Sequence, residues 1–372
     1  MSKLSLNQLE SAVATYVAGA KIAISSFSAV RDNIVGLVDK IGKIVSLDTT
    51  FYDKLPELDG DDLPFGKTIE EWYQDLILAS DYNSDADGTR ALKFYSPTFR
   101  PASYSVTLGK KIIAQSIPNN NIERAVNSQD QFLSIVNSMT KRLSDSRDAW
   151  KYQCKRQLLG VICDKIATAY SGATAYVDAT TDIEEGKFYQ QGTPAVVAVC
   201  VKARTHTAGD TWTSLLEGGF LVEIKMRKVV AIPADTTTGE AFIKAIKEAV
   251  EKAQDISEGY SLNGNTIGAE IGLSLYVKQG VMPSLEVDTM AGAFNLEKLG
   301  MGVEAKVIKD FGTTTSNAYA ILMDSRGARL HKDYEAVREN TNGFGDFLNL
   351  FHHMEYTGFA SRNTFITIFV SQ

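Results

Sequence analysis

One short string in the sequence has the residue types of a phosphate-binding loop. Residues 60–68 read Gly-Asp-Asp-Leu-Pro-Phe-Gly-Lys-Thr, and a nucleotide-binding loop places Gly-Lys-Ser/Thr after a glycine and four intervening residues. Here five residues separate the two glycines. Two aspartates and a proline also stand where a phosphate needs backbone N–H donors. The string therefore favours a structural role over a nucleotide site.

The histidines lack the spacing of metal ligands. They are His206, His331, His352 and His353, and none forms a His-x-x-x-His pair or stands in a Cys, Asp and Glu cluster with ligand spacing. Adjacent residues of a strand point to opposite faces, so His352 and His353 are not expected to share a ligand. We predict that all four are surface or satisfied strand residues and that the chain has no metal site.

No other residue type indicates catalysis. The sequence has no Gly-x-Ser-x-Gly string, and Cys154 and Cys163 fall in an expected helix, where cysteine usually packs as a small apolar residue. Glu70 and Glu71 are neighbours in an expected strand, so they face opposite ways and are interpreted as solvated charges. With Cys200 the chain has three cysteines, an odd number that indicates a reducing compartment. We predict no catalytic residue and no cofactor.

Composition limits the function classes. The chain has 372 residues, of which 44% are hydrophobic and 22% charged, as is typical of a folded protein with two core-bearing lobes. A formal net charge of −7 argues against a dedicated nucleic-acid binder but leaves weak, non-specific contact with DNA open. No run approaches the roughly 18 consecutive apolar residues of a membrane span. We therefore expect no membrane partner.

Helical periodicity predicts the elements that would position these residues. Apolar residues recur at near-helical spacing from 129 to about 170, after a Ser-x-x-Gln capping box, which predicts one long helix on the order of 60 Å in length. A second capping box, Thr237 to Glu240, starts another helix with Phe242 and Ile246 in its apolar stripe. Two further helices are expected within residues 1–45.

Extended segments alternate with these helices. Residues 66–78 and 103–117 mix β-branched and aromatic residues, so we expect them to pair as the strands of a long hairpin with a polar tip at 80–101. The composition of 195–201 and 220–232 predicts strands of a β lobe. Residues 363–370 are apolar on both faces of a strand, which predicts burial inside a sheet.

Five stretches, taken in their order along the chain, resemble the major capsid proteins of phi-29-like podophages, a branch of the Hong Kong 97-type capsid family. They are 37–42, 64–75, 288–295, 307–312 and the closing stretch 351–370. Together they span most of the chain. By this comparison the string at 60–68, which resembles a phosphate-binding loop without matching it, is the start of a hairpin strand.

The resemblance implies an α+β, Hong Kong 97-type fold with five parts. Residues 1–63 would form an N-terminal arm, and 64–118 an extended hairpin loop that reaches over a neighbouring subunit. Residues 119–266 would form a peripheral domain with a spine helix and strand insertions. Residues 267–341 would form an axial domain around the capsomer symmetry axes, and 342–372 would return to the peripheral domain.

The resemblance also implies a function and partners. The chain would assemble with itself as pentamers and hexamers into an icosahedral or prolate shell around double-stranded DNA, together with scaffolding and portal proteins. It would lie in the virion capsid, and in the host cytoplasm during assembly. The helix after Thr238 would pack beside the spine helix. An immunoglobulin-like domain, which some relatives carry after the closing strand, is expected to be absent because the chain ends at Gln372.

The expected hairpin carries the candidate intersubunit contacts. Aromatic residues and arginine are enriched at protein interfaces. From those in the hairpin we take six as candidate contacts: Trp72, Tyr73, Phe94, Tyr95, Phe99 and Arg100. Some family members also join subunits through a Lys–Asn isopeptide bond. Lys67, Lys110 and Lys111 lie in the hairpin, but the sequence identifies no partner for them, so we predict no cross-link.

Two alternative functions stay open at this point. The first is an encapsulin-like cellular compartment, whose shell would have the same fold. The second is an α/β nucleotide-binding enzyme that uses the loop at Gly66 and Lys67.

Overall fold

The structure, a computed structural model, describes residues 50–63, 68–74, 99–103, 106–118, 129–266, 268, 272–283, 303–312, 314–345 and 347–371. The chain divides into two compact units, of which the first is Met1–Phe51, Gln115–Asp145 and Glu339–Leu350, and the second is Tyr52–Ala114, Ser146–Arg338 and Phe351–Gln372. The two expected N-terminal helices and the hairpin tip at 80–98 lie outside the described residues.

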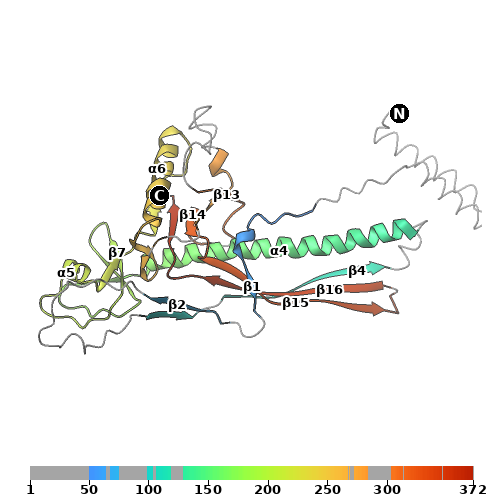
Figure 1. Cartoon of the computed structure of the whole chain (residues 1–372), viewed down its shortest axis with the longest axis horizontal. Coiled ribbons are helices and arrows are strands. Elements are labelled where there is room, and N and C mark those ends of the chain that lie inside the picture. Colours follow the sequence, from blue (N-terminus) through green and yellow to red (C-terminus); the bar gives the residue numbers. More distant parts are fainter. Residues whose placement is uncertain are drawn as a thin grey trace, which may run out of the picture. The chain divides into compact units, whose positions relative to one another are not determined.

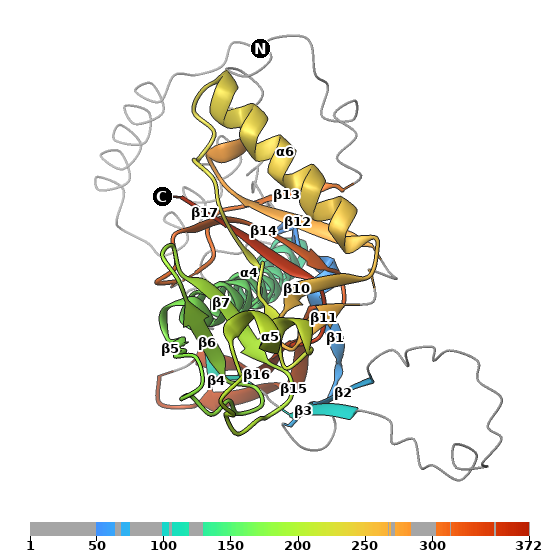
Figure 2. The ribbon, with the colours of Figure 1, turned by 90° about the vertical axis from the view of Figure 1, so that its left-hand side faces the viewer.

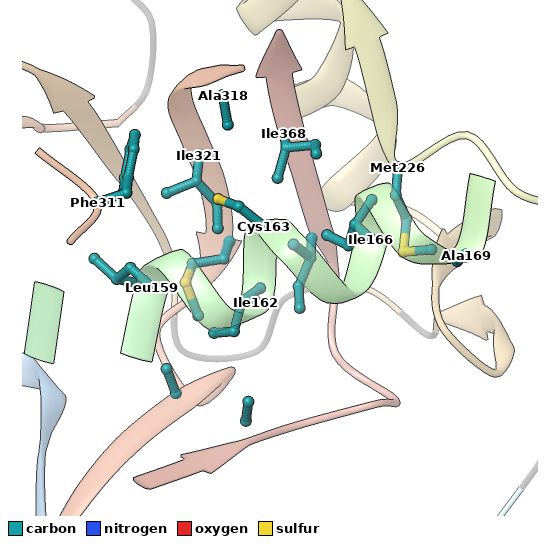
Figure 3. Packing of buried hydrophobic residues seen from close by; sticks show 14 of the residues in the cluster. Leu159, Ile162, Cys163, Ile166, Ala169, Met226, Phe311, Ala318, Ile321 and Ile368 are labelled. Carbon is teal, nitrogen blue, oxygen red and sulfur yellow. The ribbon is translucent and has the colours of Figure 1, made fainter. Parts of the chain in front are cut away.

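The long helix predicted from periodicity is confirmed as α4, Gln129–Ser171. In the second unit its buried apolar residues recur three or four positions apart, as Leu159, Ile162, Cys163 and Ile166 do. All four belong to one core cluster with strand residues such as Ile321 and Ile368, and Figure 3 shows Cys163 on the side of the helix that faces these strands. Gly160 faces the backbone of another segment, because a Cβ there would overlap the carbonyl oxygen of Phe311. The close approach of that segment to α4 therefore requires glycine at position 160.

A five-stranded sheet separates α4 from the second predicted helix, α6 (Thr236–Ala253). The strand order is β13 (Ala305–Ile308), β12 (Leu273–Lys278), β14 (Ala318–Asp324), β17 (Ile366–Val370) and β9 (Arg227–Val229). Because successive strand residues face opposite sides, Tyr276 and Ile321 pack in the α4 core, whereas Val277 and Leu322 pack with α6. The expectation that α6 packs beside the spine helix is wrong, since the sheet lies between the two helices (Figure 2).

Helix α6 begins at a different cap from the one predicted. Its N-cap is Asp235, whose carboxylate accepts a hydrogen bond of 2.8 Å from the Thr238 N–H, and the Thr238 hydroxyl completes the capping box. The predicted cap at Thr237 is therefore wrong, because Thr237 already lies inside the helix. The predicted apolar stripe is confirmed, with Phe242 and Ile246 fully buried.

A second sheet has the order β1 (Asp59–Asp62), β15 (Ala328–Asn342), β16 (Phe347–Ala360) and β4 (Val106–Pro118). Figure 1 shows β15 and β16 as neighbouring strands. In the second unit this sheet packs against α4, where Leu330, Met354 and Tyr356 surround Cys154.

The expected hairpin pairing is only partly right. β2 (Glu70–Gln74) pairs with β3 (Phe99–Ser103) in a separate two-stranded sheet. β4, which covers most of the expected partner strand, pairs instead with β16. Of the expected partner strand, Ser103 therefore belongs to the hairpin and residues 106–117 belong to the four-stranded sheet.

The predicted β lobe is a sheet of β5 (Thr174–Ala175), β6 (Phe188–Gln191), β7 (Val196–Cys200) and β8 (Leu221–Glu223). Val197 and Val199 pack in the α4 core, while Ala198 and Cys200 pack in a small core with α5 (Trp212–Glu217), a helix that the sequence pattern did not predict. The expected strand at 220–232 is divided between β8 and β9. A ribbon of β10 (Ser257–Ser261) and β11 (Gly264–Thr266) follows α6.

The closing strand is confirmed as β17, in which all five residues are buried. Its sheet takes strands from three of the expected parts, 119–266, 267–341 and 342–372. The division into peripheral and axial domains stays a prediction. Among the described residues, no helix combines the length and the apolar composition that crossing a bilayer requires.

Candidate assembly surfaces

The β2–β3 hairpin brings together four of the six predicted intersubunit residues. Residues 72–74 pair with residues 99–101 in antiparallel register. The four that lie on these neighbouring strands are Trp72, Tyr73, Phe99 and Arg100. The side chain of Trp72 is 67% exposed, which is unusual for the largest apolar side chain. Phe94 and Tyr95 lie outside the described residues, and contact of any of the six with a second subunit stays a prediction.

Glu71 attaches this hairpin to the rest of the second unit. Its carboxylate accepts a hydrogen bond from the Ser361 hydroxyl and one of 3.0 Å from the Arg362 N–H. Glu70, the preceding residue on β2, is exposed. The interpretation of both residues as solvated charges is therefore wrong for Glu71.

The turn that receives Glu71 connects the two large sheets. β16 ends at Ala360 and β17 begins at Ile366, so residues 361–365 cross from the four-stranded to the five-stranded sheet. Residues 325–327 make the opposite crossing, from β14 to β15. The crossings are hydrogen-bonded to each other, because the Ser361 N–H donates to the Gly327 carbonyl at 2.9 Å and the Asp324 N–H donates to the Phe365 carbonyl at 3.0 Å.

A buried lysine fixes the end of the expected N-terminal arm to α4. Lys155 is completely buried, and its ammonium pairs with Asp53, with Asp59 at 2.7 Å and with the Leu55 carbonyl at 2.7 Å. Burial alone would raise the pKa of Asp59, but hydrogen bonds and charge from Lys151 and Lys155 hold that pKa below its ordinary value. The segment is thus held by ion pairs that are only partly open to solvent.

The same segment contacts both large sheets. The short 3-10 helix η1 (Pro56–Leu58) carries Glu57, which accepts from the Tyr276 hydroxyl at 2.9 Å and pairs with Lys306 at 2.7 Å. β1 then runs parallel to β15, and Asp62 lies 2.8 Å from Lys332. Residues 53–62 therefore link α4, the five-stranded sheet and the four-stranded sheet.

The stretch 307–312, one of those that carry the resemblance, packs directly on α4. Asp310 pairs with Arg156 at 2.5 Å, and Phe311 is buried in the α4 core. Gly312 has φ +66°, a conformation that favours glycine, and its Cα faces the backbone of Gln157. The sequence of this stretch is thus explained by its close contact with the helix.

The string at 60–68 does not have the surroundings of a nucleotide-binding loop. Gly60 and the two aspartates after it lie in β1, with Gly60 against the ring of His331. Thr68 leads into strand β2, whereas a phosphate loop leads into a helix whose N–H groups bind the phosphate. Gly66 and Lys67 lie outside the described residues.

The titratable residues considered from the sequence have structural partners. His352 Nε2 lies 2.9 Å from Glu335, and His353, on the other face of β16, contacts the ring of Phe351. His206 Nδ1 lies 2.6 Å from Asp182, and His331 Nδ1 lies 2.9 Å from the Asp61 carbonyl oxygen. Within the described ranges, no group of three or more His, Cys, Asp or Glu side chains is close enough to hold a metal ion.

All three cysteines are buried free thiols. Burial raises the pKa of Cys154 to about 12 and that of Cys200 to about 11. Burial also raises the pKa of Cys163. Protonated, inaccessible thiols are poor nucleophiles.

The structure describes two of the three lysines that were considered for cross-linking. Lys110 lies 3.5 Å from the buried carboxylate of Glu355, and Lys111 lies over the ring of Trp150 at 5.5 Å. Lys67 lies outside the described residues. The expectation of no covalent cross-link stays a prediction.

A family model described as Phi29-like phage major capsid protein matches residues 3–370. The chain belongs to this family. Relatives of the Phi29-like family named major capsid protein include that of Bacillus phage PZA, 21% identical over 344 residues, which are 92% of this chain and 64% of the relative. That of Bacillus phage B103 is 20% identical over 338 residues, 91% of this chain and 63% of the relative. The chain thus spans just under two thirds of the length of these curated relatives.

Solved structures share the fold of this Phi29-like family member. A chain in the capsid structure of Staphylococcus phage Andhra superposes with a TM-score of 0.60 at 9% identity, covering 89% of this chain and 87% of that one. A chain in the structure of the head fiber and inner core protein gp22 of native bacteriophage P68 has a TM-score of 0.50 at 9% identity, covering 89% and 88%. The predicted α+β, Hong Kong 97-type fold is confirmed.

Proposed function

We propose that this chain is a structural protein, not an enzyme, whose copies assemble into the shell of a tailed phage. The observation that carries the proposal is the match of the Phi29-like major capsid family over residues 3–370. Two features of the molecule support it. The exposed Trp72 lies on a hairpin that forms its own two-stranded sheet, and the acidic segment 53–62 anchors the expected arm firmly to α4.

The five expected parts give the proposal its geometry. Residues 1–63 act as the arm, 64–118 as the loop over a neighbour, 119–266 and 342–372 as the peripheral domain, and 267–341 as the axial domain. Closed symmetric assemblies repeat the same contacts at every subunit, and obligate interfaces often bury about 2,000 Å² or more. An exposed tryptophan on a hairpin that forms its own two-stranded sheet is suited to such an interface.

Partners follow from the same proposal. The subunit forms pentamers and hexamers with itself and assembles with scaffolding and portal proteins in the host cytoplasm before it lies in the virion. A net charge of −7 suits a wall that makes only weak, non-specific contact with packaged DNA, because a surface that neutralised many phosphates would hold the DNA tightly.

An encapsulin-like shell of the same fold is the second candidate. Genes for a portal protein and a terminase beside this one would favour the phage, and a neighbouring cargo enzyme would favour the compartment. The nucleotide-binding enzyme is disfavoured, because the string at 60–68 leads into a strand.

The test is expression of the chain, with a scaffolding protein from the same genome, followed by negative-stain electron microscopy. Uniform closed shells, or rings of five or six subunits, are expected. A folded chain that stays monomeric under these conditions contradicts the proposal, and nucleotide titration monitored by calorimetry then tests the loop at Gly66 and Lys67.

A further inference from the structure

The two crossings between the large sheets form one hydrogen-bonded feature, which we call the sheet joint and define as residues 324–327 and 361–365. Besides the two backbone hydrogen bonds between the crossings, the joint is hydrogen-bonded to the turn of the β10–β11 ribbon. The Asn263 N–H donates to the Arg362 carbonyl at 3.2 Å, and the Asn263 amide pairs with that of Asn363. The two chain connections that lead directly from one large sheet to the other, β14 to β15 and β16 to β17, both lie here, so a change in the angle between the sheets at this edge involves these residues.

Glu71 connects the β2–β3 hairpin to this joint. Its two carboxylate oxygens accept from the Ser361 hydroxyl and the Arg362 N–H, so the side chain is held at two points and its direction is fixed. Hydrogen bonds to a charged acceptor are stronger than neutral ones. Ser361 also accepts from the N–H groups of Asn363 and Thr364, both at 3.1 Å, which orders the turn beneath the carboxylate.

The joint also contains buried polar atoms that have no hydrogen-bond partner in the described part of the chain. They are Arg362 Nε, Asn363 Nδ2 and Thr364 Oγ1. Such atoms are rare in folded proteins and destabilise the arrangement that contains them. The backbone of the turn is therefore hydrogen-bonded where Glu71 binds it, whereas three side-chain atoms of residues 362–364 lack a partner in the described part of the chain.

We propose that Glu71 is a positioning residue that sets the direction of the β2–β3 hairpin relative to the sheet joint, so that the hairpin follows any change in the joint. The importance of this coupling for a shell rests on the proposed function. Trp72, the next residue on β2, is displaced whenever Glu71 leaves the turn.

The experiment measures the direction of the hairpin in the soluble subunit. Spin labels at Gln74→Cys, on exposed β2, and Lys244→Cys, on the exposed face of α6, report a distance by double electron–electron resonance. The three native cysteines are buried, so the labels attach at the introduced sites. Glu71→Gln removes the charge, and Glu70→Gln removes the same charge from the neighbouring exposed residue as the matched control.

A narrow distance distribution is expected for the parent and for Glu70→Gln, and a broadened or shifted one for Glu71→Gln. Hydrogen exchange of the Arg362 amide should rise by roughly tenfold in Glu71→Gln alone, since a charged acceptor is replaced by a neutral amide and the hydrogen bond weakens. Ser361→Ala removes the hydroxyl that donates to Glu71 and keeps the carboxylate. It should shift the distance distribution in the same direction, and it replaces Glu71→Gln as the test if that variant does not fold.

Two results overturn the proposal. One is an unchanged distance distribution in both Glu71→Gln and Ser361→Ala. The other is a distribution that is already broad in the parent. Failure of the parent chain to form shells contradicts the proposed function only, because the distances are measured in the subunit. A shifted hairpin in Glu71→Gln with shells of parental size overturns the role in assembly and leaves the positioning role intact.

Discussion

At the scale of single residues, Lys155 has the most demanding position. Its ammonium is fully buried, whereas Asp53 and Asp59 keep 22% and 39% of their side-chain surface exposed. Lys155→Met leaves two carboxylates that water can solvate, so we expect a loss of about 1–3 kcal/mol. Asp53→Asn with Asp59→Asn leaves a buried cation without a counter-charge, and we expect about 3–5 kcal/mol. Urea unfolding at neutral pH measures both.

A matched control separates burial from ion pairing. Lys151 contacts the same Asp59 at 2.8 Å but keeps 29% of its side-chain surface exposed, so Lys151→Met should cost under about 1 kcal/mol. The pKa of Asp59 is lowered in the folded state. The stability that its ion pairs contribute is therefore present above the ordinary aspartate pKa of about 4 and is lost as pH falls through the folded-state pKa. A larger loss in Lys155→Met than in the double aspartate variant would contradict the argument.

At the scale of elements, helix α6 offers a direct comparison of two capping boxes. Asp235→Ala removes the carboxylate that accepts from the Thr238 N–H, and the unfolding equilibrium constant should rise by about fivefold, as is typical for a lost N-cap. Thr237→Ala changes the residue that the sequence pattern predicts as the cap, and it should have little effect. Thermal unfolding at neutral pH measures the difference.

The pH dependence of that difference is a further check. A hydrogen bond from the Thr238 backbone N–H is the first cause that lowers the pKa of Asp235. The deficit of Asp235→Ala should therefore be present at neutral pH and shrink as pH falls through the folded pKa. Equal losses in Asp235→Ala and Thr237→Ala would show that the cap is not where the structure has it.

Local patterns predicted helices α4 and α6 and the buried strand β17 but not the pairing of strands. The apolar period of α4 and the apolar run of β17 are properties of neighbouring residues, so the sequence contains them. The partner of β4 is β16, more than two hundred residues away, and nothing within β4 identifies it. α5 is only six residues long, too short for a helical period to be recognised.

The same limit explains why only part of the candidate assembly surface could be predicted from the sequence. Aromatic composition predicted Trp72 as a contact residue, and its exposure is consistent with that role. Glu71 was missed because its partner Ser361 lies 290 positions away. The alternation of β2 correctly placed Glu70 and Glu71 on opposite faces, but it does not say which face is covered.

At the scale of the whole molecule, we expect residues 80–101 to be dispensable for the fold and, under the proposed function, required for the shell. Neither of the two largest cores contains a described residue between 64 and 118. Deletion of residues 80–101 should therefore leave a soluble subunit with a cooperative thermal transition close to that of the parent chain. The same subunit should form no normal shells, because the loop that is proposed to reach the neighbour is gone.

Two measurements decide this last prediction, and they must be read together. Circular dichroism reports whether the deleted subunit is folded, and negative-stain electron microscopy with the scaffolding protein reports whether it assembles. Trp72→Ala changes a single residue of the hairpin. Because Trp72 is 67% exposed, it should contribute little to subunit stability. A loss of shells at an unchanged melting temperature would therefore show that Trp72 contributes to an intersubunit interface. Normal shells from the deletion variant would exclude the hairpin as an essential intersubunit contact and direct attention to the segment 53–62 and the arm before it.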